Sequence, residues 1–126
     1  MKQQTISIKE LPKLQAKAVR ERWEHLLAQQ IEDAGLPTPQ PQYHIYMPGA
    51  SHPCRADFAW PERKLLVEVQ GGQWSHGAHT RGSGFEDDCR KYSQYALLGF
   101  RLMLITPDMI SDGTAIEYLR KCLEET

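Results

Sequence analysis

The spacing of apolar residues predicts a long helix near the start of the chain. Over residues 13–34 the apolar positions return with an approximately helical period, so one face should pack inward. Gly35 is a suitable C-terminal stop, and Pro37 and Pro39 prevent the helix from continuing. The expected inward stripe consists of Leu14, Ala18, Trp23, Leu26, Leu27 and Ile31.

Shorter segments with extended character follow this helix. Residues 43–46 predict a brief strand, and residues 48–53 contain two prolines and a glycine, which is typical of a loop. Residues 56–60 and 64–69 flank the turn residues Pro61, Glu62 and Arg63. Two apolar segments around so short a turn predict a β-hairpin.

The second half of the chain predicts a helix, a strand and a final helix. Residues 85–98 have a helical pattern that ends at Gly99. The apolar run 100–105, bounded by Gly99 and Pro107, should form a buried strand. Pro107 should begin a loop, after which Asp112 or Thr114 caps a helix that carries Ile116, Leu119 and Leu123.

The predicted order of elements is α, β, β, β, α, β, α, within a single domain over residues 1–126. A helix between two strands is typical of a crossover, which places a parallel pair in an otherwise antiparallel sheet. We therefore expect an α/β protein with a central mixed four-stranded sheet flanked by helices.

Composition narrows the class of protein. Hydrophobic residues make up 40% of the chain and charged residues 25%, which is typical of a soluble globular protein. No apolar stretch approaches the roughly 18 residues of a membrane span, and the N-terminus lacks the apolar core of a signal peptide. We expect a cytoplasmic protein with no membrane partner, and the three widely spaced cysteines fit free thiols.

Two carboxylates stand inside the apolar strands of the predicted hairpin. Asp57 and Glu68 can face each other across it, and burying such charges is costly unless they are paired or bind a cation. Hard oxygen ligands favour Mg²⁺ or Mn²⁺, which could serve phosphodiester hydrolysis. The structural alternative is that either carboxylate pairs with a basic side chain, namely Arg55, Arg81 or Lys91.

The loop over residues 70–84 contains five glycines, which permit close approach of backbone to a ligand. His76, His79 and Arg81 could contact phosphate, His79 could act as a general base, and Trp74 could stack on a base. A flexible surface loop with incidental histidines is the plain alternative. A zinc site from His52, Cys54, His76 and His79 is less favoured, because the spacing matches no standard finger.

A longer run of residues carries a resemblance to a known family. The run is Arg55 to Pro61, Val67 to Gly72, His79, Arg81, Gly82, Gly84, Phe85, Asp88, Lys91 and Tyr92. It resembles the PD-(D/E)XK nuclease superfamily, in particular small phage and prophage endonucleases related to very-short-patch repair and Holliday junction-resolving enzymes. The resemblance covers roughly residues 24–109.

The resemblance implies a restriction endonuclease-like fold and a set of site residues. Asp57 and Glu68 would bind Mg²⁺ or Mn²⁺, and Glu24 matches the position from which many members add a third carboxylate. Glu21 lies one turn earlier and is the fallback. The alternative for Glu24 is a solvated or capping glutamate.

The chain departs from the family pattern at Gln70, where the signature has lysine. Glutamine can still hydrogen-bond a water molecule or a phosphate, but it brings no charge. Lys91 on the following helix could supply that charge, with Asp88 on the same helical face. The alternative for these two residues is an ordinary surface ion pair.

These observations predict a Mg²⁺-dependent endodeoxyribonuclease that acts on double-stranded or branched DNA in phage or bacterial repair or recombination. A homodimer would suit the cutting of both strands. The net charge of −1 implies that DNA contacts come from a local basic surface or through bound cations. The alternatives are an inactive nuclease fold that binds DNA or a protein, and a hydrolase of small phosphoesters.

Overall fold

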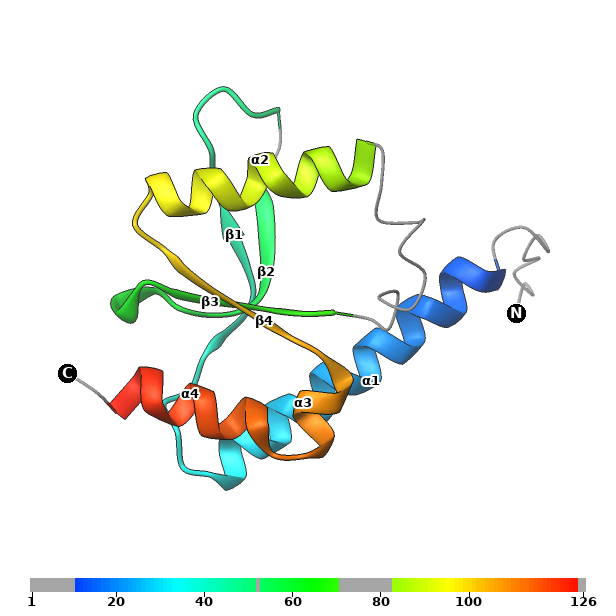
Figure 1. Cartoon of the computed structure of the whole chain (residues 1–126), viewed down its shortest axis with the longest axis vertical. Coiled ribbons are helices and arrows are strands. Elements are labelled where there is room, and N and C mark those ends of the chain that lie inside the picture. Colours follow the sequence, from blue (N-terminus) through cyan, green and yellow to red (C-terminus); the bar gives the residue numbers. More distant parts are fainter. Residues whose placement is uncertain (1–10, 52, 71–82, 125–126) are drawn as a thin grey trace, which may run out of the picture.

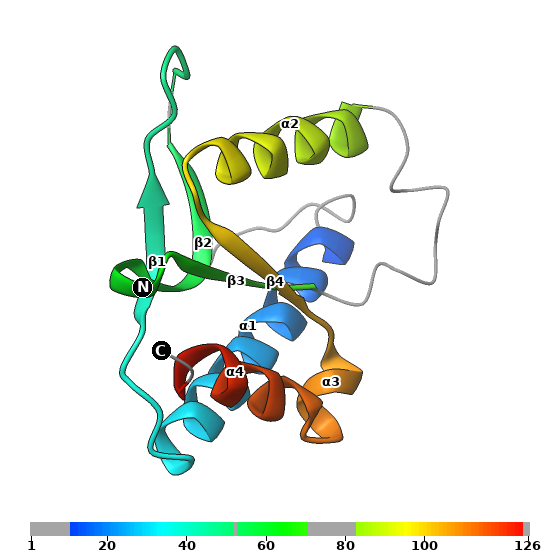
Figure 2. The same cartoon turned by 60° about the vertical axis from the view of Figure 1, so that its left-hand side comes forward.

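A four-stranded mixed sheet lies between helices on both faces in the computed structural model, which describes residues 11–51, 53–70 and 83–124. Figures 1 and 2 show α2 on one face of the sheet and α1, α3 and α4 on the other. The elements are α1 (Leu11–Asp33), β1 (Gln40–Ile45), β2 (Cys54–Trp60), η1 (Pro61–Arg63), β3 (Leu65–Val69), α2 (Ser83–Leu97), β4 (Arg101–Ile105), α3 (Pro107–Ser111) and α4 (Thr114–Glu124).

The strands lie in the order β1-β2-β3-β4. Both β1–β2 and β2–β3 are antiparallel, whereas β3 and β4 run parallel, because α2 carries the chain back to the same end of the sheet. The turn between β2 and β3 closes through η1 and Lys64, which has a left-handed φ of 53°. The expected mixed four-stranded sheet with flanking helices is confirmed.

Each face of the sheet has its own hydrophobic core. The α1 side contains Leu27, Phe58, Trp60 and Val67 together with residues of α3 and α4, and the α2 side contains Ala56, Ala59, Leu66 and Tyr95. The indole N–H of the fully buried Trp60 donates to the carbonyl of Pro37 at 2.8 Å. That bond ties the connection between α1 and β1 to β2.

The pairing of β1 with β2 is interrupted at Asp57. The register aligns Pro41 with Phe58 and Tyr43 with Ala56, but it leaves out Gln42 and Asp57 between them. Gln42 has a left-handed φ of 50°, a backbone conformation that residues other than glycine rarely adopt. Across this interruption β2 changes the face it presents, since Ala56 packs on the α2 side and Phe58 on the α1 side.

The expected inward stripe of α1 is only partly correct. Leu27 and Ile31 are buried and Trp23 packs against them at four-residue spacing, whereas Leu14, Ala18 and Leu26 are exposed. The N-terminal half of α1 extends past the sheet (Figure 1), so Leu14 and Ala18 have no sheet to contact. Leu26 precedes Leu27 and lies roughly 100° around the helix from it.

Two further expectations about the second half of the chain are wrong. β4 lies at the edge of the sheet, so only Ile105 of its five residues is buried. Residues 107–111 form α3 rather than a loop, because Pro107 occupies the first helical turn and Thr106 caps it. The Thr106 hydroxyl accepts a hydrogen bond from the Met109 amide at 3.3 Å.

The ends of the remaining elements match their patterns. α4 buries Leu119 and Leu123, and the Asp112 carboxylate accepts a hydrogen bond from the Thr114 amide at 2.9 Å. Cys54, Cys89 and Cys122 are free thiols, as their spacing indicated. Over the described ranges, no helix combines the length and apolarity that crossing a membrane requires.

Candidate functional site

Asp57 and Glu68 lie side by side where β2 and β3 separate. The two strands pair as far as Phe58 and Val67, so Asp57 and Glu68 are the next residues along each strand. The Asp57 Oδ2 atom accepts a hydrogen bond from the Val69 amide at 2.7 Å. This bond takes the place of strand pairing and holds the aspartate carboxylate beside Glu68.

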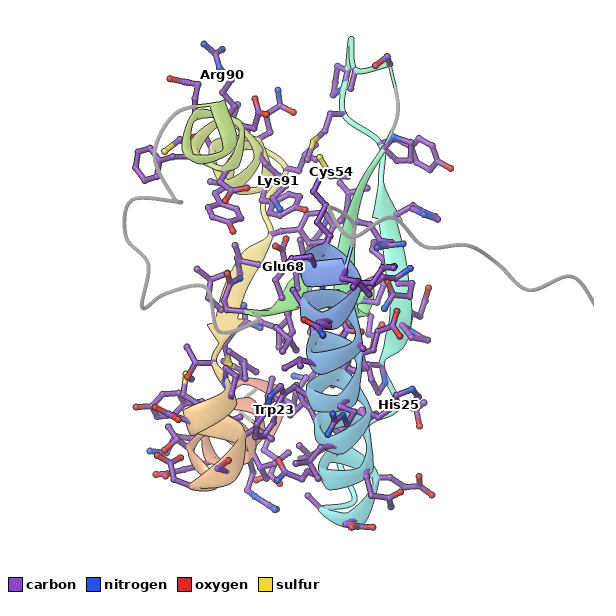
Figure 3. The ribbon with its side chains drawn as sticks, turned by 90° about the vertical axis from the view of Figure 1, so that its right-hand side faces the viewer. Trp23, His25, Cys54, Glu68, Arg90 and Lys91 are labelled. Carbon is purple, nitrogen blue, oxygen red and sulfur yellow. The ribbon has the colours of Figure 1, made fainter. Side chains whose placement is uncertain are left out.

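Glu68 is the one charged side chain that is buried among the described residues, with 7% of its surface exposed. Lys91 donates to Oε1 at 3.0 Å, and the Tyr95 hydroxyl donates to Oε2 at 3.2 Å. Burial raises the pKa of Glu68, while Lys91 opposes that shift. Figure 3 shows Lys91 reaching from α2 toward Glu68 on the sheet. The pairing with Lys91 that was the structural alternative for this carboxylate is therefore present.

Glu24 joins the pair from α1. Its carboxyl group is hydrogen-bonded to Asp57, and burial together with that contact raises the pKa of Glu24 to about 7. Two carboxylates in contact repel each other, so protonation of Glu24 or a bound cation stabilises this contact. The fallback residue, Glu21, has Lys17 as its partner at 3.9 Å, and its charge also contributes to raising the pKa of Glu24.

Lys91 and Gln70 lie close to the carboxylates. Besides its contact with Glu68, the Lys91 ammonium is 4.0 Å from Asp88, so Asp88 is part of the site through Lys91. Gln70 follows β3 directly and is hydrogen-bonded to Tyr92. Burial raises the pKa of that tyrosine to about 12, so its phenol stays protonated at neutral pH.

An open cleft of about 280 Å³ is centred on these residues. Its lining carries three cationic side chains, Arg20, Arg55 and Lys91, and three carboxylates, Asp57, Glu68 and Asp88. The formal charges of these six groups cancel. The cleft can therefore accept an anion once the carboxylates are offset by a cation or a proton.

Glu24, Asp57 and Glu68 offer only oxygen atoms as ligands, and a hard divalent cation prefers oxygen ligands. The contact between Glu24 and Asp57 marks a position that a cation could take. Within the ranges that the structure describes, no three Asp, Glu, His or Cys side chains stand ready as a metal-ligand group. Each oxygen of Glu68 already accepts one hydrogen bond, and the positive charge of Lys91 beside Oε1 opposes a cation there.

Several predicted site residues lie outside the described ranges, and three residues of the site were not predicted. Trp74, His76, His79 and Arg81 lie outside the described residues, as does His52 of the zinc alternative. Tyr95 was not predicted as a site residue, although it is both buried and bonded to Glu68. The spacing could have indicated two more, because Arg20 lies one turn before Glu24 and Arg55 lies two strand positions before Asp57.

Comparison with known proteins gives little further information. The chain is similar to two uncharacterized proteins of Mycobacterium tuberculosis, from strain CDC 1551 / Oshkosh and strain H37Rv, at 32% identity over 76 residues in each case. The aligned segment is 60% of this chain but only 26% of the length of those relatives. No family model and no solved structure matches the chain.

Proposed function

We propose that this chain is a Mg²⁺-dependent endodeoxyribonuclease of the PD-(D/E)XK type. The observation that carries the proposal is the convergence of Glu24, Asp57 and Glu68 from α1, β2 and β3, with the Lys91 ammonium 3.0 Å from Glu68. Asp57, Glu68 and the Lys91 amine line one cleft and Glu24 contacts Asp57, and such a group suits the hydrolysis of a phosphodiester. A restriction endonuclease-like fold is part of the same proposal.

Asp57, Glu68 and Glu24 would hold the cation. When bound, Mg²⁺ would offset charge at the scissile phosphate and help to ionise the attacking water. Lys91 takes the role that the signature gives to a lysine at position 70, because its ammonium lies against the same glutamate from α2. Gln70 hydrogen-bonds the water or a phosphate oxygen and is itself held by Tyr92.

The contact between Lys91 and Glu68 also favours a second candidate function. If that ion pair stays closed, the positive charge of Lys91 opposes a cation at Glu68, and the domain would bind DNA without cutting it. This candidate predicts that the protein retains DNA in a gel shift, that no product forms with Mg²⁺ or Mn²⁺, and that Asp57→Ala leaves binding unchanged.

Cleavage of supercoiled plasmid and of a synthetic four-way junction tests the proposal. The protein is incubated with Mg²⁺, Mn²⁺ or EDTA, and wild type is compared with Asp57→Asn and Glu68→Gln. Glu117→Gln is the matched control, because Glu117 is an exposed glutamate of α4 that pairs with Lys121. We expect cation-dependent cutting that both site variants lose and the control keeps. Absence of cutting by wild type with either cation contradicts the proposal.

A further inference from the structure

Two arginines of the cleft have no role in the arrangement described so far. Arg20 lies on α1 and Arg55 on β2, and both line the cleft beside Asp57. Neither guanidinium makes a hydrogen bond or an ion pair within 4.0 Å to any other residue in the described part of the chain. Lys91, the third cation of the cleft, is by contrast held by Glu68.

The positions of the two arginines follow from the elements that carry them. Arg20 is four residues before Glu24, so the two side chains share one face of α1. The Arg20 charge lowers the pKa of Glu24, which places its guanidinium within electrostatic range of the carboxyl pair. Arg55 is two residues before Asp57 on β2 and reaches the cleft from the strand.

Guanidinium groups with free donors at a cleft are suited to one class of ligand. Their planar fork of N–H groups matches the oxygens of a phosphate and can bind it through two parallel hydrogen bonds. Three carboxylates also line this cleft. The guanidinium groups can therefore hold a phosphate other than the one that lies against the carboxylates. A strand of nucleic acid offers such a second phosphate next to the one that is cut.

We propose that Arg20 and Arg55 form a binding site for the phosphate adjacent to the scissile one, and so set the register of the strand in the cleft. This inference rests on the proposed function for the identity of the strand as substrate. The binding step itself needs no cleavage and can be measured separately. Both arginines are positioning residues, because they touch the strand away from the reacting atoms.

The test measures binding of a fluorescein-labelled oligonucleotide, single-stranded and duplex, by anisotropy over a range of KCl concentrations. The measurement is made in EDTA and again in Ca²⁺, for wild type, Arg20→Gln and Arg55→Gln. Each lost phosphate contact should weaken binding about tenfold at low salt. Each should also reduce the slope of log affinity against log salt by about 0.7 for the single strand and about 0.9 for the duplex.

Arg22→Gln is the matched control for charge. Arg22 is exposed, lies on the same helix, does not line the cleft and stands roughly 200° around α1 from Arg20. Its replacement should leave the slope unchanged. Arg55→Lys should keep the salt slope but lose affinity, because lysine retains the charge without the planar fork.

Two outcomes overturn the inference: failure of wild type to bind either oligonucleotide in both conditions, or slopes for Arg20→Gln and Arg55→Gln that match Arg22→Gln. Failure of the proposed nuclease activity alone would give a different result. Binding that depends on the arginines, in a protein that never cuts, supports the phosphate site and contradicts only the proposed cleavage.

Discussion

The Tyr95 hydroxyl donates to the Oε2 atom of Glu68 at 3.2 Å, from a ring of which only 1% is exposed. Tyr95 itself does not line the cleft. The bond lowers the pKa of Glu68 and so helps to keep it ionised against the effect of burial. Tyr95 therefore acts as a positioning residue for Glu68.

Tyr95→Phe should reveal this role through pH. With the bond removed, the pKa of Glu68 should rise further, so the acid limb of the pH–cleavage profile should move toward higher pH. Leaving Oε2 without its donor should also lower the free energy of unfolding by about 1–2 kcal/mol in urea titrations. Tyr46→Phe, at a tyrosine that is 75% exposed, is the control. An unmoved acid limb would show that the bond is merely structural.

Lys91→Met should destabilise the fold, because it leaves the buried Glu68 carboxylate without its cation. A loss of about 2–3 kcal/mol in the free energy of unfolding is expected at neutral pH. The double variant with Glu68→Gln should recover most of that loss, since no unpaired charge then remains. Additive losses in the two single variants and the double variant would mean that the pair is not coupled.

Glu24 should make the stability of the protein fall as pH rises. Its pKa is higher in the folded chain, about 7 against 4.5, so folding favours the protonated form. The stabilisation is complete below the lower value and is lost as pH increases through the upper one. Urea midpoints of wild type should therefore decrease between about pH 5 and about pH 8, and Glu24→Gln should remove about 1–2 kcal/mol of that decrease. An identical decrease in the variant would mean that a group other than Glu24 is responsible for the pH dependence.

Mg²⁺ should reverse this trend if the carboxyl groups bind it. A bound cation favours the ionised form of Glu24, so the rise in melting temperature on adding Mg²⁺ should be larger above the Glu24 pKa of about 7 than below it. EDTA should abolish the rise. Asp57→Asn should show no rise at any pH, whereas Glu117→Gln should respond as wild type does. Equal stabilisation of all three proteins would indicate binding somewhere else.

Gln42→Gly should be neutral or stabilising, which is unusual for glycine within a strand. Gln42 has a φ of 50°, a conformation that costs a residue with a Cβ atom about 1 kcal/mol and costs glycine little. Gln42→Val should be clearly less stable than wild type in the same urea titration. If Gly and Val destabilise equally, the left-handed conformation is not what selects the residue.

Most of the fold could be predicted because its signals are local. Gly99 and Pro107 bound β4, Gly35 ends α1, and the turn at residues 61–63 separates the two strands of the hairpin. The errors concern burial, which depends on neighbours distant in sequence. Nothing in the run 100–105 indicates that β4 is the last strand of the sheet, and nothing near Leu14 indicates that the sheet ends before it.

The residues of the candidate site that could be predicted are those whose charge conflicts with the apolar pattern of the surrounding strand. Asp57 and Glu68 stand out as charges inside apolar strands, and Glu24 came from the family resemblance. Tyr95 gave no such signal, because a tyrosine at an inward helical position is explained by packing alone. The interruption at Gln42 and Asp57 was not predictable either, since glutamine has no preference for the left-handed conformation that Gln42 adopts.

Asp57 and Glu68 belong to the two inner strands of the sheet, with β1 and β4 outside them. They are next to Phe58 and Val67, whose backbones are roughly 5 Å apart as in neighbouring strands, and that separation cannot change without breaking the sheet. Glu24 and Lys91 reach the same point from helices, which can slide or tilt by small amounts without such a loss. The spacing of the two strands is therefore fixed, and only the helix side of the cleft can adapt to a ligand of another size. Shortening Glu68 to aspartate should therefore be harder to compensate than changing the reach of the side chain at position 24 or 91.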